Sequence, residues 1–322
     1  YIMESELRAE HSAILATPLF HISGFGVMHG PLLHAGGSLF LIDRFSPERV
    51  IAALTRFRPT HLFLVSAMWV QMTELESFQS ARFPFVTFVS TAAGPLSDAR
   101  QAAVRRAFPN AQFGWGYGMT ESCVTTIKSQ RTEELEQHPG TLGYGWRHVQ
   151  YRLVDESGQP LESAVGTGEL QVKGTTVFKG YWNNPEATRE AVDADGWLRS
   201  GDLFHFDADG FAYFRGRSKD MIKTGGENVS SREVEETIYR LAAVSEVAVV
   251  ALSDPRWVEA VSAVVVVKEG EELDEATVIA HCKEHLAHFK CPKRVIFTDN
   301  LPRNPSGKIL KRNLRTAYEG ST

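Results

Sequence analysis

The sequence predicts an α/β region, then a small β subdomain that is an antiparallel sheet or barrel-like, then an α+β domain at the C-terminus. Three observations support this fold class. Short apolar runs alternate with helical patterns over residues 13–114, which is typical of a parallel sheet. Short strand patterns separated by turn residues follow over residues 140–214, and strands and helices mix after Asp220. The expected domains are therefore 1–139, 140–218 and 219–322.

Composition describes a globular protein of two or more domains. The 322 residues are 43% hydrophobic and 23% charged, which is enough to bury a sizeable core. A formal net charge of -5 gives no basic excess, so we do not expect a nucleic-acid partner. The longest apolar run, Val247 to Leu252, is far too short to span a membrane.

The cysteines indicate a reducing, cytoplasmic location. Cys123, Cys282 and Cys291 are too few and too scattered for a disulfide framework or a zinc site. A buried structural role is favoured for them over a catalytic one. The chain begins at Tyr1 in a polar segment with no signal peptide, and we expect further residues upstream.

In the first region, strand and helix patterns can be placed in order. Ser46 and Ser97 are the expected N-caps of the two helices. The second helix has an alanine stripe at 99, 102, 103 and 107, which leaves Arg105 and Arg106 facing solvent. The predicted strands are Ile14–Thr17, Ser38–Ile42, His61–Val65 and Val86–Thr91, and the predicted helices are Pro47–Phe57 and Leu96–Phe108.

Two loops follow strands of this region, and each has two interpretations. His21, in the loop from Thr17 to Gly24, either lines a ligand pocket or caps the next helix. The small residues from Ser90 to Pro95 either admit a flat ring against the backbone or form a simple strand-to-helix turn.

The segment Gly114–Ser122 brings three different chemical groups together. Glycines on both sides of Tyr117 would expose its ring for stacking. Thr120 supplies a hydroxyl for phosphate, and Glu121 supplies an oxygen ligand suited to Mg²⁺. This convergence favours a functional site over a structural turn.

The later regions have the following expected elements. A capping box of Ser230 and Glu233 starts the first helix of the C-terminal domain, whose apolar face is Val234, Ile238 and Leu241. The predicted strands are Gln150–Val154, Gly168–Val172, Leu203–Phe206, Phe211–Phe214, Val244–Leu252, Ala260–Val267 and Arg294–Phe297, and the predicted helices are Pro185–Ala191, Ser230–Leu241 and Asp274–Leu286.

Chemistry-bearing residues concentrate between Ser200 and Glu235. Asp202, expected in a tight turn after Gly201, is either a ribose ligand or an ordinary turn aspartate. Arg217 is either a phosphate or ribose contact or a surface ion-pair partner. Gly225 and Gly226 allow positive φ, which serves close approach to a ligand or a plain β-turn equally.

The last motif is Leu301–Leu310. Pro302 and Pro305 stiffen the loop, and Gly307 lets it turn, so Lys308 is expected at the head of a basic helix. It is either a site residue or a solvated lysine.

Taken together, five of these motifs resemble the AMP-forming adenylating superfamily, which includes acyl-CoA synthetases, peptide-synthetase adenylation domains and firefly luciferase. The motifs match in order and spacing across essentially the whole chain. They are Tyr117–Glu121, Ser200–Leu203, Gly216–Asp220, Lys223–Asn228 and Pro305–Lys308.

The resemblance implies a two-step ligase that uses ATP, Mg²⁺ and coenzyme A. A small-molecule carboxylate and ATP form an acyl-adenylate and pyrophosphate, and a thiol then displaces AMP. Lys308 would bridge the carboxylate and the α-phosphate, with Thr120 and Glu121 at the phosphates and Glu121 on Mg²⁺. The nucleotide-binding residues would be Ala92, Ala93, Gly94, Gly116, Tyr117, Gly118, Met119, Thr120, Asp202, Phe214, Arg217 and Lys308.

Further roles follow from the same resemblance. His21 and Phe25 would line the acyl pocket, and Lys219 would be the hinge of a mobile C-terminal domain. Gly225 and Gly226 would line the tunnel for coenzyme A. The form Gly-Gly-Glu-Asn-Val resembles synthetases for fatty or aryl acids.

Two alternatives remain beside the CoA ligase: transfer to a carrier-protein thiol, and a truncated remnant that binds nucleotide without catalysis. The family's Ser/Thr/Gly-rich phosphate loop would precede Tyr1. We therefore expect this chain to be a truncated gene product or part of a longer protein, and by itself to bind nucleotide poorly and to adenylate slowly or not at all. The sequence does not indicate an oligomeric state.

Overall fold

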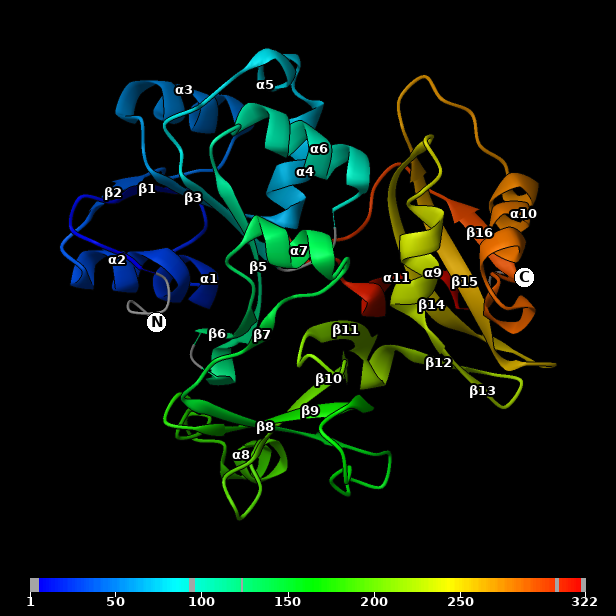
Figure 1. Ribbon diagram of the computed structural model, residues 1–322. Helices are drawn as coiled ribbons and strands as arrows, with labels where there is room; N and C mark the ends of the chain where they lie inside the picture. The colour runs from blue at the N-terminus through cyan, green and yellow to red at the C-terminus, as the bar shows by residue number, and fades with distance from the viewer. Residues whose placement is uncertain (1–5, 93–95, 123, 305–306, 320–322) are drawn as a thin grey trace. The chain divides into compact units, whose positions relative to one another are not determined.

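A computed structural model describes residues 6–92, 96–122, 124–304 and 307–319 (Figure 1). The chain forms two compact units. The first, called the N-terminal unit, is Tyr1–Ser200 with Phe204–Phe214, and the second, called the C-terminal unit, is Gly201–Leu203 with Arg215–Thr322. The three-part division with boundaries after residues 139 and 218 remains a prediction.

A seven-stranded sheet organises the N-terminal unit. Its order is β2-β1-β3-β4-β5-β6-β7, with β1 to β5 paired in parallel and β6 and β7 antiparallel. The α/β prediction is therefore confirmed. The strands are β1 (Ser12–Leu15), β2 (Ser38–Leu41), β3 (His61–Val65), β4 (Phe88–Ala92), β5 (Gln112–Met119), β6 (Val124–Lys128) and β7 (Tyr144–Gly145).

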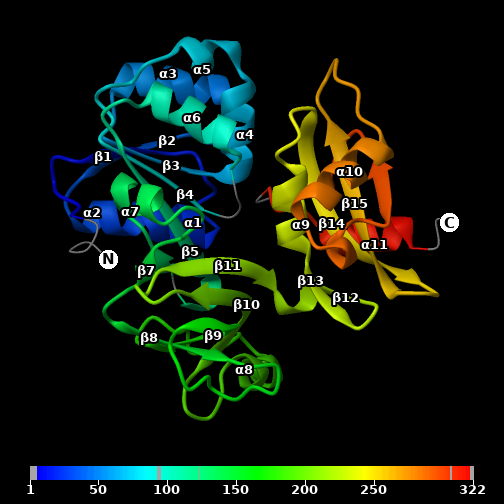
Figure 2. The same cartoon turned by 45° about the vertical axis from the view of Figure 1, so that its right-hand side comes forward.

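Helices cover both faces of this sheet. Figures 1 and 2 show α3 to α6 on one face and α1 and α2 on the other. Successive side chains of β3 point to opposite faces of the sheet and pack into both helical layers. Leu62 and Leu64 join one core cluster, and Phe63 joins the other. The helices are α1 (Ile22–Gly24), a π-helical turn (Phe25–His29), α2 (Gly30–His34), α3 (Pro47–Phe57), α4 (Ser66–Glu74), α5 (Glu76–Ser80), α6 (Asp98–Ala107) and α7 (Thr132–Gln137).

The capping predictions are confirmed, but the alanine stripe of α6 is wrong. The Ser46 and Ser97 hydroxyls accept hydrogen bonds from the first turns of α3 and α6. In α6, Val104 and Ala107 are buried while Ala99 and Ala102 are exposed. The larger Val104 buries more apolar surface than an alanine, so it determines the inward face.

One of the two arginines on α6 does not face solvent as expected. Arg106 is exposed, but Arg105 is only half exposed. Its guanidinium pairs with Glu136 at 2.8 Å and lies 5.3 Å from the centre of the Phe113 ring. The aromatic face and the carboxylate together hold the side chain against the protein.

A four-stranded sheet follows, in the order β11-β10-β9-β8. Trp146, Leu170 and Phe204 belong to its buried core. The strands are β8 (Val149–Val154), β9 (Gly166–Gly174), β10 (Leu198–Phe206) and β11 (Ala212–Arg217), and α8 (Pro185–Ala191) has the predicted bounds.

The C-terminal unit contains a sheet in the order β13-β12-β15-β14, with β16 paired in parallel to β15 (Figure 2). The N-cap Ser230 is confirmed, since its hydroxyl accepts from the Glu233 amide. The elements are β12 (Met221–Thr224), β13 (Glu227–Ser230), α9 (Ser231–Ile238), β14 (Val244–Asp254), β15 (Val258–Val267), α10 (Glu275–His285), β16 (Arg294–Phe297) and α11 (Lys311–Tyr318).

Two buried cysteines lie in the core of this unit. Burial raises the pKa of the Cys282 thiol to about 12, and it also raises the pKa of Cys291. Thiolates are therefore scarce at neutral pH, which confirms the structural interpretation for these two residues. Cys123 lies outside the described residues.

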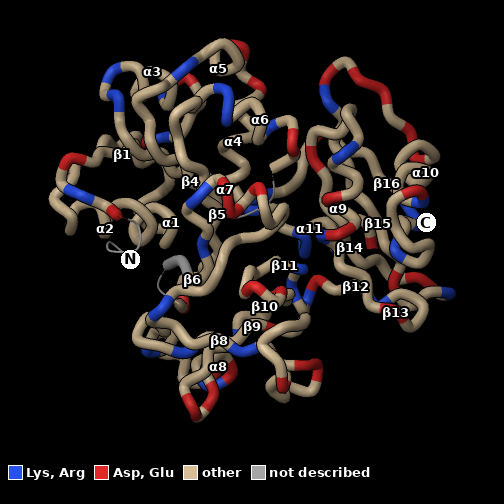
Figure 3. Tube along the Cα trace, viewed as in Figure 1, with Lys and Arg blue, Asp and Glu red and all other residues tan. Residues whose placement is uncertain are grey.

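Charged residues of both signs are interspersed along the trace of each unit, as Figure 3 shows. Among the helices of the described residues, none combines the length and the apolar content that a membrane span requires.

Candidate active site

Asp202 and Arg217 form an ion pair in the C-terminal unit. Asp202 lies in β10 and is only 2% exposed, and Arg217 ends β11. The Arg217 Nε lies 3.0 Å from the Asp202 Oδ1, and the arginine side chain keeps 34% of its surface exposed. The pair compensates a buried carboxylate while leaving part of the guanidinium accessible to a ligand.

The expected tight turn at Asp202 is wrong. Gly201 has a φ of +67° inside β10, so the left-handed glycine lies within a strand and not at its end. The sequence Gly-Asp suggests a turn because glycine is the usual residue at positive φ, which many turns require. Here the strand continues from Leu198 to Phe206 and carries the carboxylate into the interior.

Lys308 lies close to the same pair. Its pKa is lowered, first by desolvation and then by the positive charge of Arg217, while the carboxylate of Asp202 opposes the shift. The side chain is exposed by surface area, yet nearby protein displaces enough water to disfavour its charge. Three predicted site residues that are distant in sequence therefore come together.

A short loop holds Lys308 in place. The Asn304 amide N donates to the Lys308 carbonyl at 3.0 Å, and the Lys308 amide N donates to the Asn304 Oδ1 at 2.9 Å. The expectation that Lys308 heads a basic helix is wrong, because α11 begins at Lys311. Arg303 and Ile309 form an isolated antiparallel bridge just before this helix. Pro305 lies outside the described residues.

Lys219 is near this cluster as well. It is exposed in a 3₁₀ turn (Ser218–Asp220) directly after β11, and its charge also lowers the pKa of Lys308. The next residue, Asp220, pairs with Arg315 of α11 at 3.4 Å. The hinge role of Lys219 remains a prediction.

In the N-terminal unit, β5 positions Tyr117. Its ring lies 4.8 Å from the Phe204 ring in an edge contact and 6.3 Å from the Phe214 ring in a stacked one. The side chain is half-buried, so the flanking glycines expose less of the ring than the sequence suggested. Tyr117 and Phe214, both predicted nucleotide-binding residues, are thus brought together.

The residues around Tyr117 lie where strands β4 and β5 end. Ala92 pairs with Gly116 in the parallel register, and Gly118 and Met119 complete β5. Ala93 and Gly94 lie outside the described residues. Thr120, in the 3₁₀ turn that follows β5, is exposed.

Glu121 is fixed by a loop that contains no predicted site residue. The Tyr181 hydroxyl donates to the Glu121 Oε1 at 2.7 Å, and the Phe178 amide N donates to the Glu121 carbonyl at 2.8 Å. The hydrogen bond to Glu121 raises the pKa of Tyr181 to about 12, so the phenol stays protonated at neutral pH. The Tyr181 phenol is therefore the hydrogen-bond donor, and it orients the Glu121 carboxylate.

Tyr181 could have been found from the sequence. Phe178, Tyr181 and Trp182 form a short aromatic cluster beside Gly180, before the proline that starts α8. Exposed aromatics next to a glycine turn often mark a binding loop. Its partner, however, lies 60 residues away in the sequence and could not be read from the local pattern.

His21 caps a helix, which was one of its two interpretations. Its Nδ1 accepts from the Ser23 amide N at the start of α1. Gly24 packs tightly, because a Cβ there would lie 2.2 Å from the Pro18 carbonyl oxygen. The neighbouring Phe25 is 56% exposed. The acyl-pocket role of His21 and Phe25 remains a prediction.

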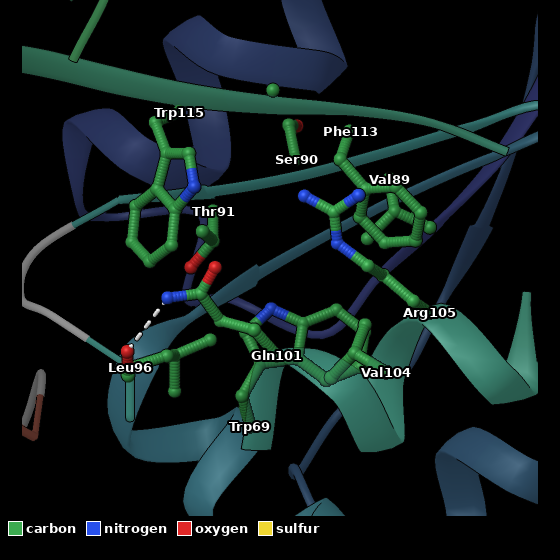
Figure 4. Close-up of a pocket in the computed structure, with 11 residues that line it drawn as sticks. Trp69, Val89, Ser90, Thr91, Leu96, Gln101, Val104, Arg105, Phe113 and Trp115 are labelled. Atoms are coloured by element: carbon green, nitrogen blue, oxygen red, sulfur yellow. Dashed lines mark hydrogen bonds between the residues drawn. The ribbon is translucent and has the colours of Figure 1, made fainter. Parts of the chain in front are cut away.

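A small cavity of about 30 Å³ is lined by residues of α4, β4, α6 and β5 (Figure 4). Trp69, Thr91, Gln101 and Trp115 are among its lining residues, and Gln101 Nε2 donates to the Leu96 carbonyl at 2.9 Å. The volume is too small for a nucleotide or an acyl group.

Gly225 and Gly226 form the two-residue loop between β12 and β13. Their φ values are +60° and +87°, which is the pattern of a type I′ hairpin turn. The Gly225 amide N donates to the Trp257 carbonyl at 2.9 Å. The β-turn interpretation is confirmed, and the role toward coenzyme A remains a prediction.

Known families and proteins match this chain along most of its length. The AMP-binding enzyme family matches residues 2–182, and the AMP-binding enzyme C-terminal domain matches residues 233–308. A feruloyl-CoA synthase of Amycolatopsis sp is 36% identical over 98% of this chain and 64% of its own length. A long-chain-fatty-acid–CoA ligase of Mycobacterium tuberculosis is 33% identical over 98% and 61%.

Solved structures give the same result. ATP-bound MatB from Rhodopseudomonas palustris superposes with a TM-score of 0.90 at 31% identity, covering 99% of this chain and 62% of that one. o-Succinylbenzoate CoA synthetase from Bacillus subtilis, in complex with its acyl-adenylate, gives 0.85 at 28% identity, covering 98% and 62%. The chain thus spans somewhat less than two thirds of the length of these relatives.

Proposed function

Because the chain belongs to the family of AMP-binding enzymes, we propose that it acts in the ATP-dependent joining of a carboxylic acid to coenzyme A. A carboxylate oxygen attacks the α-phosphorus of ATP, and pyrophosphate leaves with the electron pair of the broken bond. The coenzyme A thiolate then attacks the acyl carbon, and AMP leaves. The observation that supports this best is the cluster of Asp202, Arg217 and Lys308.

Lys308 is the proposed catalytic residue for the first step. Negative charge builds on the α-phosphate and shifts from the attacking carboxylate as the new bond forms. An ammonium held between these oxygens stabilises that transition state more than the ground state. The Asn304 contacts fix the backbone that carries it, so the charge is placed before substrate arrives.

Asp202 and Arg217 are the proposed nucleotide ligands of the same unit. A carboxylate accepts hydrogen bonds from the two ribose hydroxyls, and the exposed part of the guanidinium suits a phosphate or ribose oxygen. Tyr117, with Phe214 against its ring, would provide the aromatic surface for adenine. Ala92, Gly116, Gly118 and Met119 supply backbone around it.

The residues at the end of β5 fit a magnesium ion. Glu121 offers a hard carboxylate oxygen, Tyr181 orients it, and the exposed Thr120 hydroxyl is next to it in the chain. Mg²⁺ typically takes one or two carboxylates together with substrate phosphates. When bound, the ion would neutralise phosphate charge, and Glu121 would be the residue that holds it.

The acid is proposed to be a fatty or an aryl acid. The named relatives include synthetases for feruloyl-CoA and for long-chain fatty acyl-CoA, and His21 and Phe25 are the proposed pocket residues. Gly225 and Gly226 are proposed to contact coenzyme A in the second step, with Lys219 as the hinge between the steps.

To test this proposal, the purified chain is incubated with ATP, Mg²⁺, coenzyme A and one of three acids: ferulate, indoleacetate or palmitate. Mass spectrometry then measures the AMP and the acyl-CoA that form. We expect acid-dependent AMP formation that Lys308→Ala removes. Repeating the assay with a carrier protein in place of coenzyme A tests the alternative in which the acyl group passes to a carrier-protein thiol.

A binding assay makes the test independent of turnover. A non-hydrolysable acyl-sulfamoyl adenosine is titrated calorimetrically into the chain and into Asp202→Asn. Tighter binding to the unchanged chain supports the proposal. Absence of both acid-dependent AMP release and analogue binding would contradict it.

A further inference from the structure

Three side chains of the types that bind metals lie together at the end of α10, and none of them has a role assigned above. His281, Glu284 and His285 have the spacing i, i+3 and i+4, which places them on one face of a helix. One ligand atom of each lies within 4.8 Å of the others. Glu284 and His285 are exposed, and His281 is half-buried.

Hydrogen bonds to backbone carbonyls fix the tautomers of both imidazoles. The His281 Nε2 lies 3.0 Å from the Thr237 carbonyl oxygen of α9, and the His285 Nδ1 lies 2.9 Å from the His281 carbonyl oxygen. A carbonyl oxygen only accepts, so each of these nitrogens carries a proton. The lone pairs are therefore on His281 Nδ1 and His285 Nε2.

This arrangement is typical of metal ligands. Imidazoles that bind a metal usually donate their other N–H to a carbonyl or carboxylate, which orients the ring. The two rings are 4.4 Å apart between centroids and tilted by 36°. The group also occupies the last turn of an eleven-residue helix, where the partial negative charge of the carbonyls favours a cation.

We propose that His281, Glu284 and His285 form a divalent transition-metal site and that Zn²⁺ is the ion that fits it. Two nitrogens and one carboxylate oxygen are a common zinc ligand set, and the exposed side of the site lets water complete the coordination. Because His281 also bonds to α9, a bound ion restrains the contact between α9 and α10. This site shares no residue with the proposed magnesium site at Glu121, whose ligands are oxygens only.

The test titrates ZnCl₂ into the chelator-treated chain by calorimetry, with excess MgCl₂ present to fill oxygen-ligand sites. We expect the unchanged chain to bind one equivalent of zinc and His285→Ala to bind none. Glu284→Gln should bind zinc at least about tenfold more weakly than the unchanged chain. His288→Ala is the matched control, because His288 is exposed three residues later and is not in the cluster. Equal zinc stoichiometry in the unchanged chain and His285→Ala would overturn the proposal, as would no binding to the unchanged chain.

Hydrogen exchange gives a second readout that does not depend on catalysis. Zinc is expected to slow exchange of the α10 amides near its C-terminal end in the unchanged chain and not in His285→Ala. Circular dichroism confirms that the variant keeps its helices. Slowing of the same amides in both proteins would place the ion elsewhere and refute the assignment.

Discussion

The Arg217 Nε lies 3.0 Å from the Oδ1 of the buried Asp202. Asp202→Asn keeps the shape of the side chain but removes its charge, so the guanidinium loses its compensation and a ribose loses a strong acceptor. We expect AMP to bind at least about tenfold more weakly, since a charge-assisted hydrogen bond contributes about 1.5–3 kcal/mol. Calorimetry measures this, with the exposed Asp209→Asn as control. Similar affinity in both variants would refute the nucleotide role.

The pKa of Lys308 should be visible in a titration. Desolvation and Arg217 lower it, so the ammonium loses its proton at a less alkaline pH than an ordinary lysine does. Replacing Arg217 with Gln removes a positive neighbour and should raise the pKa, whereas Asp202→Asn removes a negative one and should lower it further. Reductive ¹³C-methylation and NMR titration measure these shifts, with Lys308→Arg used to assign the signal. Shifts of the same sign in both variants would contradict the proposed arrangement.

Tyr181→Phe tests the orientation of Glu121. The variant removes the donor at 2.7 Å and leaves the ring in place. One hydrogen bond contributes about 1 kcal/mol, so the Mg²⁺ concentration for half-maximal adenylation should rise about fivefold. Trp182→Phe, at an exposed neighbouring position, serves as the control. An unchanged Mg²⁺ requirement in Tyr181→Phe would show that Glu121 needs no such support.

His61 should make the fold sensitive to acid. Burial, together with the charges of His11 and Lys128, lowers its pKa to about 3, so the folded chain keeps this imidazole neutral where the unfolded chain protonates it. Stability is then lost as the pH falls from about 6.5 toward 3, by about 2 kcal/mol between pH 7 and pH 5. Urea unfolding of the unchanged chain and His61→Gln at both pH values measures the difference. The exposed His148→Gln should behave like the unchanged chain, and an equal acid loss in His61→Gln would exclude His61 as its source.

Gly226→Ala separates the two chemical steps. Gly226 and Gly270 both have left-handed φ values, +87° and +81°, and a Cβ at either one meets no atom within 4 Å. Alanine therefore costs each about 1 kcal/mol of backbone strain. If Gly226 contacts coenzyme A, only its variant slows thioester formation from a pre-formed acyl-adenylate, with pyrophosphate exchange unchanged. Equal effects of the two substitutions on the second step would remove Gly226 from the proposed tunnel.

Local signals predicted much of the fold. Four apolar residues, 62–65, follow His61 without a break, and Pro47–Phe57 has a serine cap and a proline at its first position, so both elements have the expected bounds. The hairpin β12–β13 was not predicted as strands, because its residues are mostly polar and its stability comes from pairing across the Gly225–Gly226 loop.

The sequence predicted which residues belong to the candidate site better than it predicted the local structure that holds them. Sequence motifs selected Asp202, Arg217 and Lys308, but a strand in place of a turn and a bridged loop in place of a helix start depend on tertiary contacts. The hydrogen bond between Glu121 and Tyr181 spans 60 residues and follows from no local pattern.

The tight packing of Gly24, the last residue of α1, limits how the proposed acyl pocket could be redesigned. Any side chain at residue 24 would collide with the Pro18 carbonyl oxygen, whereas the next side chain, Phe25, projects largely into solvent. Mutant libraries aimed at new carboxylic acids would therefore yield misfolded members at the first position and folded ones at the second. With Phe25 in the proposed acyl pocket, selectivity is open to engineering at Phe25 and closed to it at Gly24.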